Sequence, residues 1–171
     1  MNKVDTPTHN IPAEIAAEIK AMGKQFNEEI AGQTREIYMP LLEAIDRSGI
    51  TVTSDISYGA HERNLLDVHV ADGGVAGAPT VIFFHGGGFV RGHKNVAGDV
   101  LHGNVANFFV RNGMIGINAT YRLAPEAKWP DGAEDVRAAL AWARENIAHY
   151  GGDPDKIFFL GQSAGASHVA T

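Results

Sequence analysis

One serine in the sequence has the surroundings of a catalytic nucleophile. Ser163 is the centre of a Gly-x-Ser-x-Gly pattern, which directly follows the apolar run 157–160. On a turn between a strand and a helix, this pattern holds a serine in a strained, exposed backbone conformation. The flanking glycines leave room where the two elements meet, and the N-terminus of the helix stabilises negative charge beside the serine. The pattern therefore predicts nucleophilic catalysis by Ser163.

A second glycine-rich turn, residues 86–88, follows another apolar run, residues 80–84. It does not match a phosphate-binding loop, because the Gly-Lys-Ser/Thr that such a loop requires is absent around Gly92. It does not match a dinucleotide-binding fingerprint either, because Arg91 occupies the place of the third glycine. The other use of such a turn is to direct backbone N–H groups at a developing oxyanion. Together with a serine nucleophile the turn indicates an oxyanion hole, and two packing turns without chemistry remain the alternative.

A serine nucleophile needs a general base and an acid that orients the base. In a strand–turn–helix arrangement of this kind the order along the chain is serine, then Asp or Glu, then His. His168 follows Ser163 on the same helix, about one and a half turns further on, and is expected to point away from the hydroxyl. His85 and His93 lie on the glycine-rich turn, and without further ligands they do not make a metal site. We therefore expect both partners beyond Thr171, which makes the sequence the N-terminal portion of a longer enzyme, a clipped chain or one of two chains.

The residues before the first apolar strand show two different patterns, one helical and one β-type. Apolar side chains recur every three or four residues over 11–45, which predicts helix. Pro40 and Gly49 are expected to interrupt this pattern, and Ile37, Leu41 and Ile45 form a second, shorter apolar stripe. Two short β-type runs follow at 51–59 and 64–71, and their pattern predicts a hairpin.

Three β/α steps follow the hairpin. Apolar runs at 80–84, 114–121 and 156–160 predict strands, and the continuous run at 80–84 is typical of a strand buried on both faces. The helix after the first strand is expected to bury the face formed by Leu101, Val105, Phe108 and Phe109. The helix after the second strand is expected to begin at a capping-box pair, Asp131 and Glu134. Strands that alternate with helices indicate an α/β fold with a mainly parallel sheet and helices on both faces.

The composition excludes several classes of protein. The 171 residues carry 14 Lys and Arg against 20 Asp and Glu, and this formal charge of −6 argues against nucleic acid or anionic membranes as partners. The chain has no cysteine, which excludes disulfides and thiolate metal sites. No apolar run approaches the roughly 20 residues of a membrane span. We expect a soluble, cytoplasmic protein.

Four segments together resemble a known family. They are HGGGF at 85–89, YRLAPEAKWP at 121–130, GGDPDKI at 151–157 and GQSAGA at 161–166. From about Asn64 to Thr171, their order and spacing resemble the α/β-hydrolase fold, and most closely the hormone-sensitive-lipase-like carboxylesterases, with feruloyl-esterase-like and formamidase-like relatives nearby. The resemblance implies that residues 1–50 are an N-terminal helical cap segment. It also implies that residues 51–171 are the N-terminal part of the hydrolase core, with the C-terminal strands missing from this chain.

The resemblance also implies roles for individual residues. It makes Ser163 the nucleophile, and it forms the oxyanion hole from Gly86, Gly87 and the amide of Ala164. His85 becomes an anchor of the glycine loop rather than a base. Within YRLAPEAKWP it implies cis peptide bonds at Ala124-Pro125 and Trp129-Pro130. The sequence departs from the family at Thr120, where an acidic residue usually precedes the Tyr-Arg pair.

The function implied by these roles is that of a serine carboxylesterase. Such an enzyme cleaves small-molecule carboxylic esters of small or aromatic acids through an acyl-enzyme on Ser163, without metal or cofactor. The chain is expected to need the missing C-terminal part of the fold, and it could form a homo-oligomer. Three alternatives stay open: an amide or formamide hydrolase, a non-catalytic hydrolase-fold protein that binds a ligand, and an inactive fragment.

Overall fold

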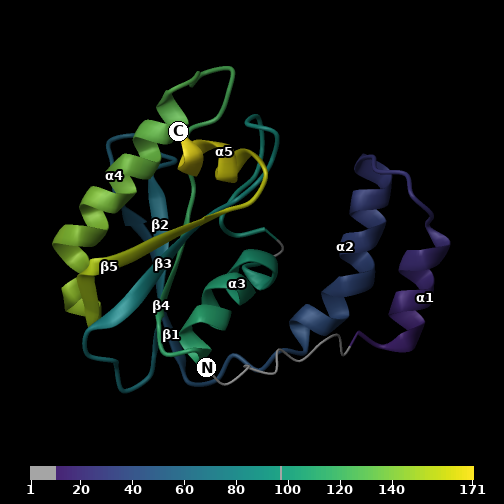
Figure 1. The fold of residues 1–171 in the computed structure, drawn as a ribbon, viewed down its shortest axis with the longest axis horizontal. Helices are drawn as coiled ribbons and strands as arrows, with labels where there is room; N and C mark the ends of the chain where they lie inside the picture. Colours follow the sequence, from purple (N-terminus) through teal and green to yellow (C-terminus); the bar gives the residue numbers. More distant parts are fainter. Residues whose placement is uncertain (1–10, 97) are drawn as a thin grey trace, which may run out of the picture. The chain divides into compact units, whose positions relative to one another are not determined.

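The computed structural model describes residues 11–96 and 98–171 (Figure 1). The chain divides into two compact units, Met1–Ala44 and Ile45–Thr171. Within the described residues, no helix has the length and the apolar composition that crossing a bilayer requires.

The first unit is a pair of helices, α1 (Ala13–Ala21) and α2 (Glu28–Glu43). The predicted interruption at Pro40 is wrong, because α2 runs through this residue. The chain leaves the helical path earlier, at Gly23, where φ is 79°. It enters α2 at Asn27, whose side-chain oxygen accepts the N–H of Ile30 at 2.9 Å and caps the helix. Pro40 begins the last turn of α2, so its missing N–H removes only one late bond of the helix.

The second unit is built on a five-stranded sheet in the order β1-β2-β4-β3-β5. The strands are β1 (Ile50–Ser57), β2 (Leu65–Ala71), β3 (Ala78–Phe84), β4 (Ile115–Ala119) and β5 (Gly152–Gly161). The predicted hairpin is confirmed, since β1 and β2 pair antiparallel. β2 and β4 are also antiparallel, whereas β3 pairs in parallel with both β4 and β5. Both glycine-rich turns follow the carboxyl ends of neighbouring parallel strands, β3 and β5. They therefore lie side by side at the same end of the sheet.

Helices cover both faces of the sheet, as the alternation of elements predicts. They are α3 (Val100–Arg111), α4 (Asp131–Asn146) with the 3₁₀ helix η1 (Ile147–Tyr150), and the short α5 (Ala164–Ala170). The predicted capping box at the start of α4 is wrong. Pro130 is the N-cap and has no side-chain bond, and the Asp131 carboxylate instead accepts the N–H of Lys128 at 2.8 Å. This bond closes the turn that leads into the helix.

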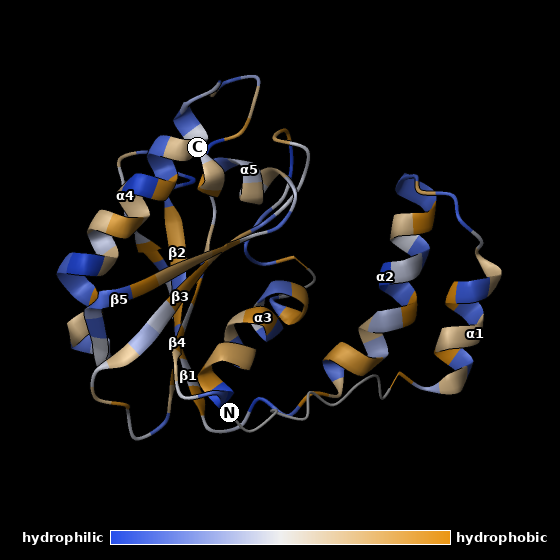
Figure 2. Ribbon diagram, viewed as in Figure 1, coloured by the Kyte–Doolittle hydropathy of each residue, from blue (hydrophilic) through white to orange (hydrophobic). Residues whose placement is uncertain are grey.

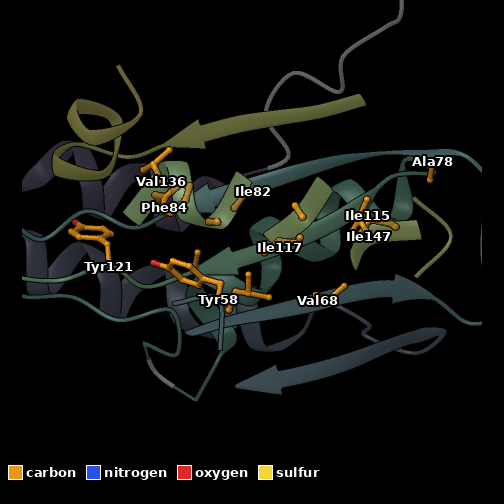
Figure 3. Packing of buried hydrophobic residues seen from close by; sticks show 14 residues of the cluster. Tyr58, Val68, Ala78, Ile82, Phe84, Ile115, Ile117, Tyr121, Val136 and Ile147 are labelled. Atoms are coloured by element: carbon orange, nitrogen blue, oxygen red, sulfur yellow. The ribbon is translucent and has the colours of Figure 1, made fainter. Parts of the chain in front are cut away.

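The apolar core lies between the sheet and α4 (Figure 3). Side chains alternate across a strand, so every second residue of β2, β3 and β4 faces this helix. The buried residues of this cluster include Leu66, Val68, Ile82, Phe84, Ile115 and Ile117 from the sheet, and Val136, Ala139, Ala143 and Ile147 from α4 and η1. The core therefore fixes β3 and β4 in the middle of the sheet.

The opposite face of the sheet is covered by α3, and the helix is rotated relative to the prediction. The predicted face is partly or largely exposed, and Phe108 reaches 60% exposure. Apart from Val110, the buried residues of α3 are small or polar instead, and include Ala106 and Asn107. Gly116 of β4 explains the rotation, because a Cβ there would overlap the backbone of Ala106. The helix thus approaches the sheet at a glycine, and the Asn107 amide bonds to the buried His69 ring at 2.8 Å.

Candidate active site

Ser163 lies on the sharp turn between β5 and α5. Its backbone has φ 50° and ψ −115°, a conformation that residues other than glycine rarely adopt. The predicted backbone strain at Ser163 is therefore confirmed. The flanking glycines are required by close packing. A Cβ at Gly161 would lie 2.5 Å from backbone atoms of Ala166, and one at Gly165 would overlap the carbonyl of Phe84. The turn therefore presses the start of α5 against the ends of two strands.

The glycine loop lies directly against this turn. A Cβ on Gly86 would be 3.3 Å from the Cβ of Ser163 and 3.2 Å from the carbonyl oxygen of Gln162. The two turns are also joined by a hydrogen bond, since the N–H of Gln162 donates to the Phe84 carbonyl at 3.1 Å. They meet because β3 and β5 are parallel neighbours whose registered ends are Phe84 and Gly161.

The loop binds its own carbonyl groups and leaves amides free. The Gly87 carbonyl accepts the N–H groups of Val90 at 3.3 Å and Arg91 at 3.1 Å. Within residues 11–96 and 98–171, the N–H groups of Gly86, Gly87 and Ala164 donate to no protein acceptor. Unbonded N–H groups beside a strained serine are the donors that a developing oxyanion requires.

His85 is an internal support of the loop. It is fully buried, and its Nδ1–H donates to the Gly86 carbonyl at 2.7 Å, since a carbonyl can only accept. Its ring stacks on Tyr121 with centroids 4.5 Å apart, and the Tyr121 hydroxyl donates to the His85 carbonyl at 2.8 Å. Burial lowers the pKa of His85 to about 4, so the ring is neutral near pH 7. The other ring nitrogen, Nε2, is buried and has no hydrogen-bond partner among the described residues, so His85 supports the loop and forms no hydrogen bond to Ser163.

His168 packs against aromatic side chains. Its ring contacts Tyr121 and Phe89 edge-on, with centroids 4.6 Å and 5.3 Å away, and sits over Gly132, where a Cβ would overlap it. Burial lowers the pKa of His168. No hydrogen bond joins it to Ser163 in the described part of the chain. The same part of the chain contains no cluster of three or more His, Cys, Asp or Glu side chains that could hold a metal ion.

The segment between β4 and α4 supports the glycine loop from one side. Both predicted cis bonds, Ala124-Pro125 and Trp129-Pro130, are present. The Ala124 N–H donates to the Phe89 carbonyl at 2.9 Å, which ties this segment to the loop. Arg122 holds the segment to α4, because its Nε donates to the Asp135 carboxylate at 2.9 Å. Where the family usually has an acid, the Thr120 hydroxyl donates to the Leu65 carbonyl at 3.0 Å.

An apolar cavity of about 260 Å³ adjoins the loop. It is lined chiefly by Phe89, Trp129, Ala124, Ala127 and His168. Trp129 is largely exposed, so the cavity opens to solvent on that side.

Two loop supports were missed from the sequence. Arg63 donates from Nη2 to the Gly92 carbonyl and from Nε to the Tyr121 carbonyl, both at 2.8 Å. Lys94 is buried and paired with two carboxylates. Neither residue belongs to a local pattern, and only its long-range partners could have identified it.

The fold agrees with comparisons to known proteins. Residues 66–171 match the protein family described as BD-FAE. The chain belongs to the BD-FAE family. The prediction of an α/β-hydrolase related to the hormone-sensitive-lipase-like esterases is thereby confirmed.

Its relatives in sequence are named esterases. Esterase LipQ of Mycobacterium tuberculosis is 35% identical over 168 residues, which cover 91% of this chain and 39% of LipQ. The probable carboxylic ester hydrolase LipM of the same organism is 40% identical over 114 residues, 65% of this chain and 26% of LipM. This member of the BD-FAE family thus spans well under half the length of these relatives.

Solved structures show the same fold. A bacterial heroin esterase superposes with a TM-score of 0.65 at 26% identity, and the match covers 92% of this chain and 50% of that one. Esterase B from Lactobacillus rhamnosis superposes with a TM-score of 0.66 at 23% identity, over 92% of this chain and 47% of the other. The described residues correspond to about half of each of these hydrolases.

Proposed function

We propose that this chain supplies the nucleophile and the oxyanion hole of a carboxylesterase that cleaves small-molecule esters of small or aromatic acids. The observation that carries the proposal is the contact between Gly86 and Ser163, with the serine in a strained conformation and unbonded amides beside it. The names of LipQ and LipM support the ester as the substrate class. An amide or formamide hydrolase would use the same arrangement, and no observation on the structure favours it over the ester.

The proposed reaction proceeds in two acyl transfers. The Ser163 hydroxyl forms a bond to the acyl carbon while its proton passes to a general base, and the carbonyl oxygen becomes an oxyanion. The N–H groups of Gly86, Gly87 and Ala164 stabilise that oxyanion. When it collapses, the ester C–O bond breaks, and the alcohol leaves with the proton from the base. Water then releases the acid by the same route, so the reaction uses neither metal nor cofactor.

The base and its acid are assigned to residues outside these 171. The support is that neither His85 nor His168 forms a hydrogen bond to Ser163 within the described residues, and that Nε2 of each ring is buried without a partner. The chain also spans only 39% of LipQ, which leaves room for both partners in a longer protein. Residues 1–50 are assigned to an N-terminal helical cap segment.

The test is covalent labelling of the full-length gene product with an alkyl fluorophosphonate, followed by peptide mass spectrometry. We expect one phosphonylated residue, Ser163, and turnover of a short-chain p-nitrophenyl ester in the same preparation. A matched anilide substrate run in parallel distinguishes an esterase from an amidase. Labelling at another serine, or none with a folded protein, would contradict the proposal.

Two further assignments belong to the same proposal. A cytoplasmic location is the first, and cell fractionation tests it. A homo-oligomer is the second, and light scattering of the full-length gene product tests it.

A further inference from the structure

The glycine loop, residues 85–94, ends in a lysine that has no access to solvent. The Lys94 side chain is 0% exposed, and its Nζ donates to Asp55 at 2.6 Å and to Asp67 at 2.7 Å. With its amide oriented to suit both neighbours, Asn95 accepts from Nζ at 3.1 Å and donates to the second Asp67 oxygen at 2.9 Å. All three donors of the ammonium group thus have acceptors, which is the condition for keeping a charge buried.

The two carboxylates come from strands on the far side of the sheet. Asp67 is buried on β2, which is separated from β3 by β4. Asp55 lies at an irregularity of β1 with φ 57°, and its N–H donates to Asp67 at 2.8 Å. A positive φ at a residue other than glycine is strained and persists only where surrounding bonds compensate for it. Here the strain turns both the N–H and the carboxylate of Asp55 toward the buried pair.

A second cation holds the last part of the loop, residues 91–94, which we call the arm of the loop. Arg63 bridges the Gly92 carbonyl and the Tyr121 carbonyl, each at 2.8 Å. Tyr121 in turn donates to the carbonyl of His85, where the loop begins. Lys94 and Arg63 therefore brace the end of the loop against β1, β2 and the segment after β4.

The braced arm is packed directly against the proposed oxyanion donors. A Cβ on Gly92 would overlap both the Gly86 carbonyl and the His85 ring. A Cβ on Gly87 would overlap the carbonyl of Arg91. No side chain separates the arm from these glycines, so a displacement of residues 91–94 moves the Gly86 and Gly87 peptide groups with it.

We infer that Lys94 is a positioning residue: by docking between Asp55 and Asp67, it fixes the direction in which the Gly86 and Gly87 N–H groups point. Arg63 acts beside it on the same arm. The catalytic consequence rests on the proposed function, whereas the mechanical one concerns the loop alone. Donors aimed at an oxyanion are effective only when held within a fraction of an ångström by surrounding groups.

The test uses three variants of the full-length gene product. Lys94→Met removes the charge and leaves Asp67 buried without its partner, which can prevent folding. Lys94→Met combined with Asp67→Asn removes both buried charges, while the Asp55 side chain, 64% exposed, can be hydrated. Lys156→Met is the matched control, because Lys156 is 55% exposed and forms only a local pair with Asp153.

Two readouts separate positioning from folding. In hydrogen–deuterium exchange, we expect peptides that cover 85–94 to exchange about tenfold faster in the double variant, with the core strands unchanged. In ester hydrolysis, we expect kcat to fall about 100-fold with KM changed less than about threefold, the size of a lost oxyanion donor. The double variant should regain the melting temperature lost by Lys94→Met without regaining kcat, and Lys156→Met should match the wild type in both assays.

The outcomes for the loop and for the function are distinguishable. Loop exchange at the wild-type rate in a folded double variant would overturn the inference, whatever the activity. Faster loop exchange with an unchanged kcat would overturn the catalytic role of Lys94. A wild type that hydrolyses no ester and takes up no phosphonate would overturn the proposed function, and the exchange data would still decide whether Lys94 holds the loop.

Discussion

The strands β3 and β5 look alike in sequence and differ in their surroundings. Each carries an apolar run into a glycine turn, TVIFF before the glycine loop and KIFFL before Ser163. β3 lies between β4 and β5, and its residues from Thr80 to Phe84 are buried. β5 pairs only with β3 within the described residues, and Figure 2 shows the hydrophobic colouring of this strand. Its residues Phe158 and Leu160 are 55% and 40% exposed. Two of the three proposed oxyanion donors, Gly86 and Gly87, thus follow a strand paired on both sides, whereas the nucleophile and the Ala164 amide follow a strand at the edge of the described sheet.

The largest expected effect concerns the turn after β5. Ser163→Ala in the full-length gene product should lower ester turnover at least about 10⁴-fold, because no other group can form the acyl-enzyme. Initial rates with a p-nitrophenyl ester measure this effect. The control is Ser167→Ala, an exposed serine one turn along α5, which should keep the wild-type rate. Comparable losses in both variants would mean that damage to α5, and not the loss of a nucleophile, explains the result.

The 171-residue chain by itself isolates the contribution of the general base and its acid. It should show negligible turnover, because oxyanion stabilisation without a base leaves only about 10³–10⁴-fold acceleration over water. The measurement uses the same ester and the same protein concentration as the full-length gene product. Turnover at ordinary enzymatic rates that Ser163→Ala abolishes would place a base within these residues, and His85 and His168 would be the first to re-examine.

The next effect compares the two strands as parts of the core. Ile82 of β3 is fully buried, so Ile82→Ala should destabilise the 171-residue chain by about 2–5 kcal/mol. Leu160 of β5 is 40% exposed, so Leu160→Ala should cost about 1 kcal/mol or less. Urea unfolding followed by circular dichroism measures both. Equal losses would show that β5 is as well packed as β3 and would remove the basis of the comparison.

The sequence predicted the elements whose signals are local. Both glycine turns, their strands and the strained Ser163 follow from short motifs, because glycine spacing and apolar runs act within a few residues. The face that α3 buries could not be predicted, since it depends on Gly116 in another strand and on the pairing of Asn107 with His69. The burial of Lys94 could not be predicted either, because its partners Asp67 and Asp55 lie 27 and 39 residues away along the chain.

His85, at the end of β3, should make stability depend on pH. Burial depresses its pKa from 6.5 to about 4, so the unfolded chain binds a proton more readily than the folded one below pH 6.5. The stability contributed by neutral His85 is therefore complete above pH 6.5 and is lost as the pH falls through about 4. The loss amounts to about 3 kcal/mol at most.

Urea unfolding at pH 7, 6, 5 and 4 measures this dependence. His85→Asn is the comparison, because its amide can still donate to the Gly86 carbonyl but does not titrate. The wild type should lose more stability than this variant between pH 6.5 and 4, while the contribution of carboxylates is common to both. Parallel curves would show that His85 is hydrated in the folded state, and β3 would then end in a less protected turn than its burial indicates.

The smallest effect on stability, and the clearest on solubility, is expected at the outer face of β5. Phe158 is 55% exposed on an edge strand, and exposed apolar edges promote pairing with other chains. Phe158→Lys in the 171-residue chain should change the free energy of unfolding by no more than about 0.5 kcal/mol, since a surface residue is replaced. The charge should nevertheless reduce aggregation, because a lysine on an edge opposes strand addition. Light scattering against concentration measures this, with the exposed Phe26 of the other unit changed to Lys as the control. If Phe26→Lys improved solubility as much as Phe158→Lys, net charge alone would explain the gain. If only Phe158→Lys improves it, the edge beside the nucleophile is the surface through which these chains associate.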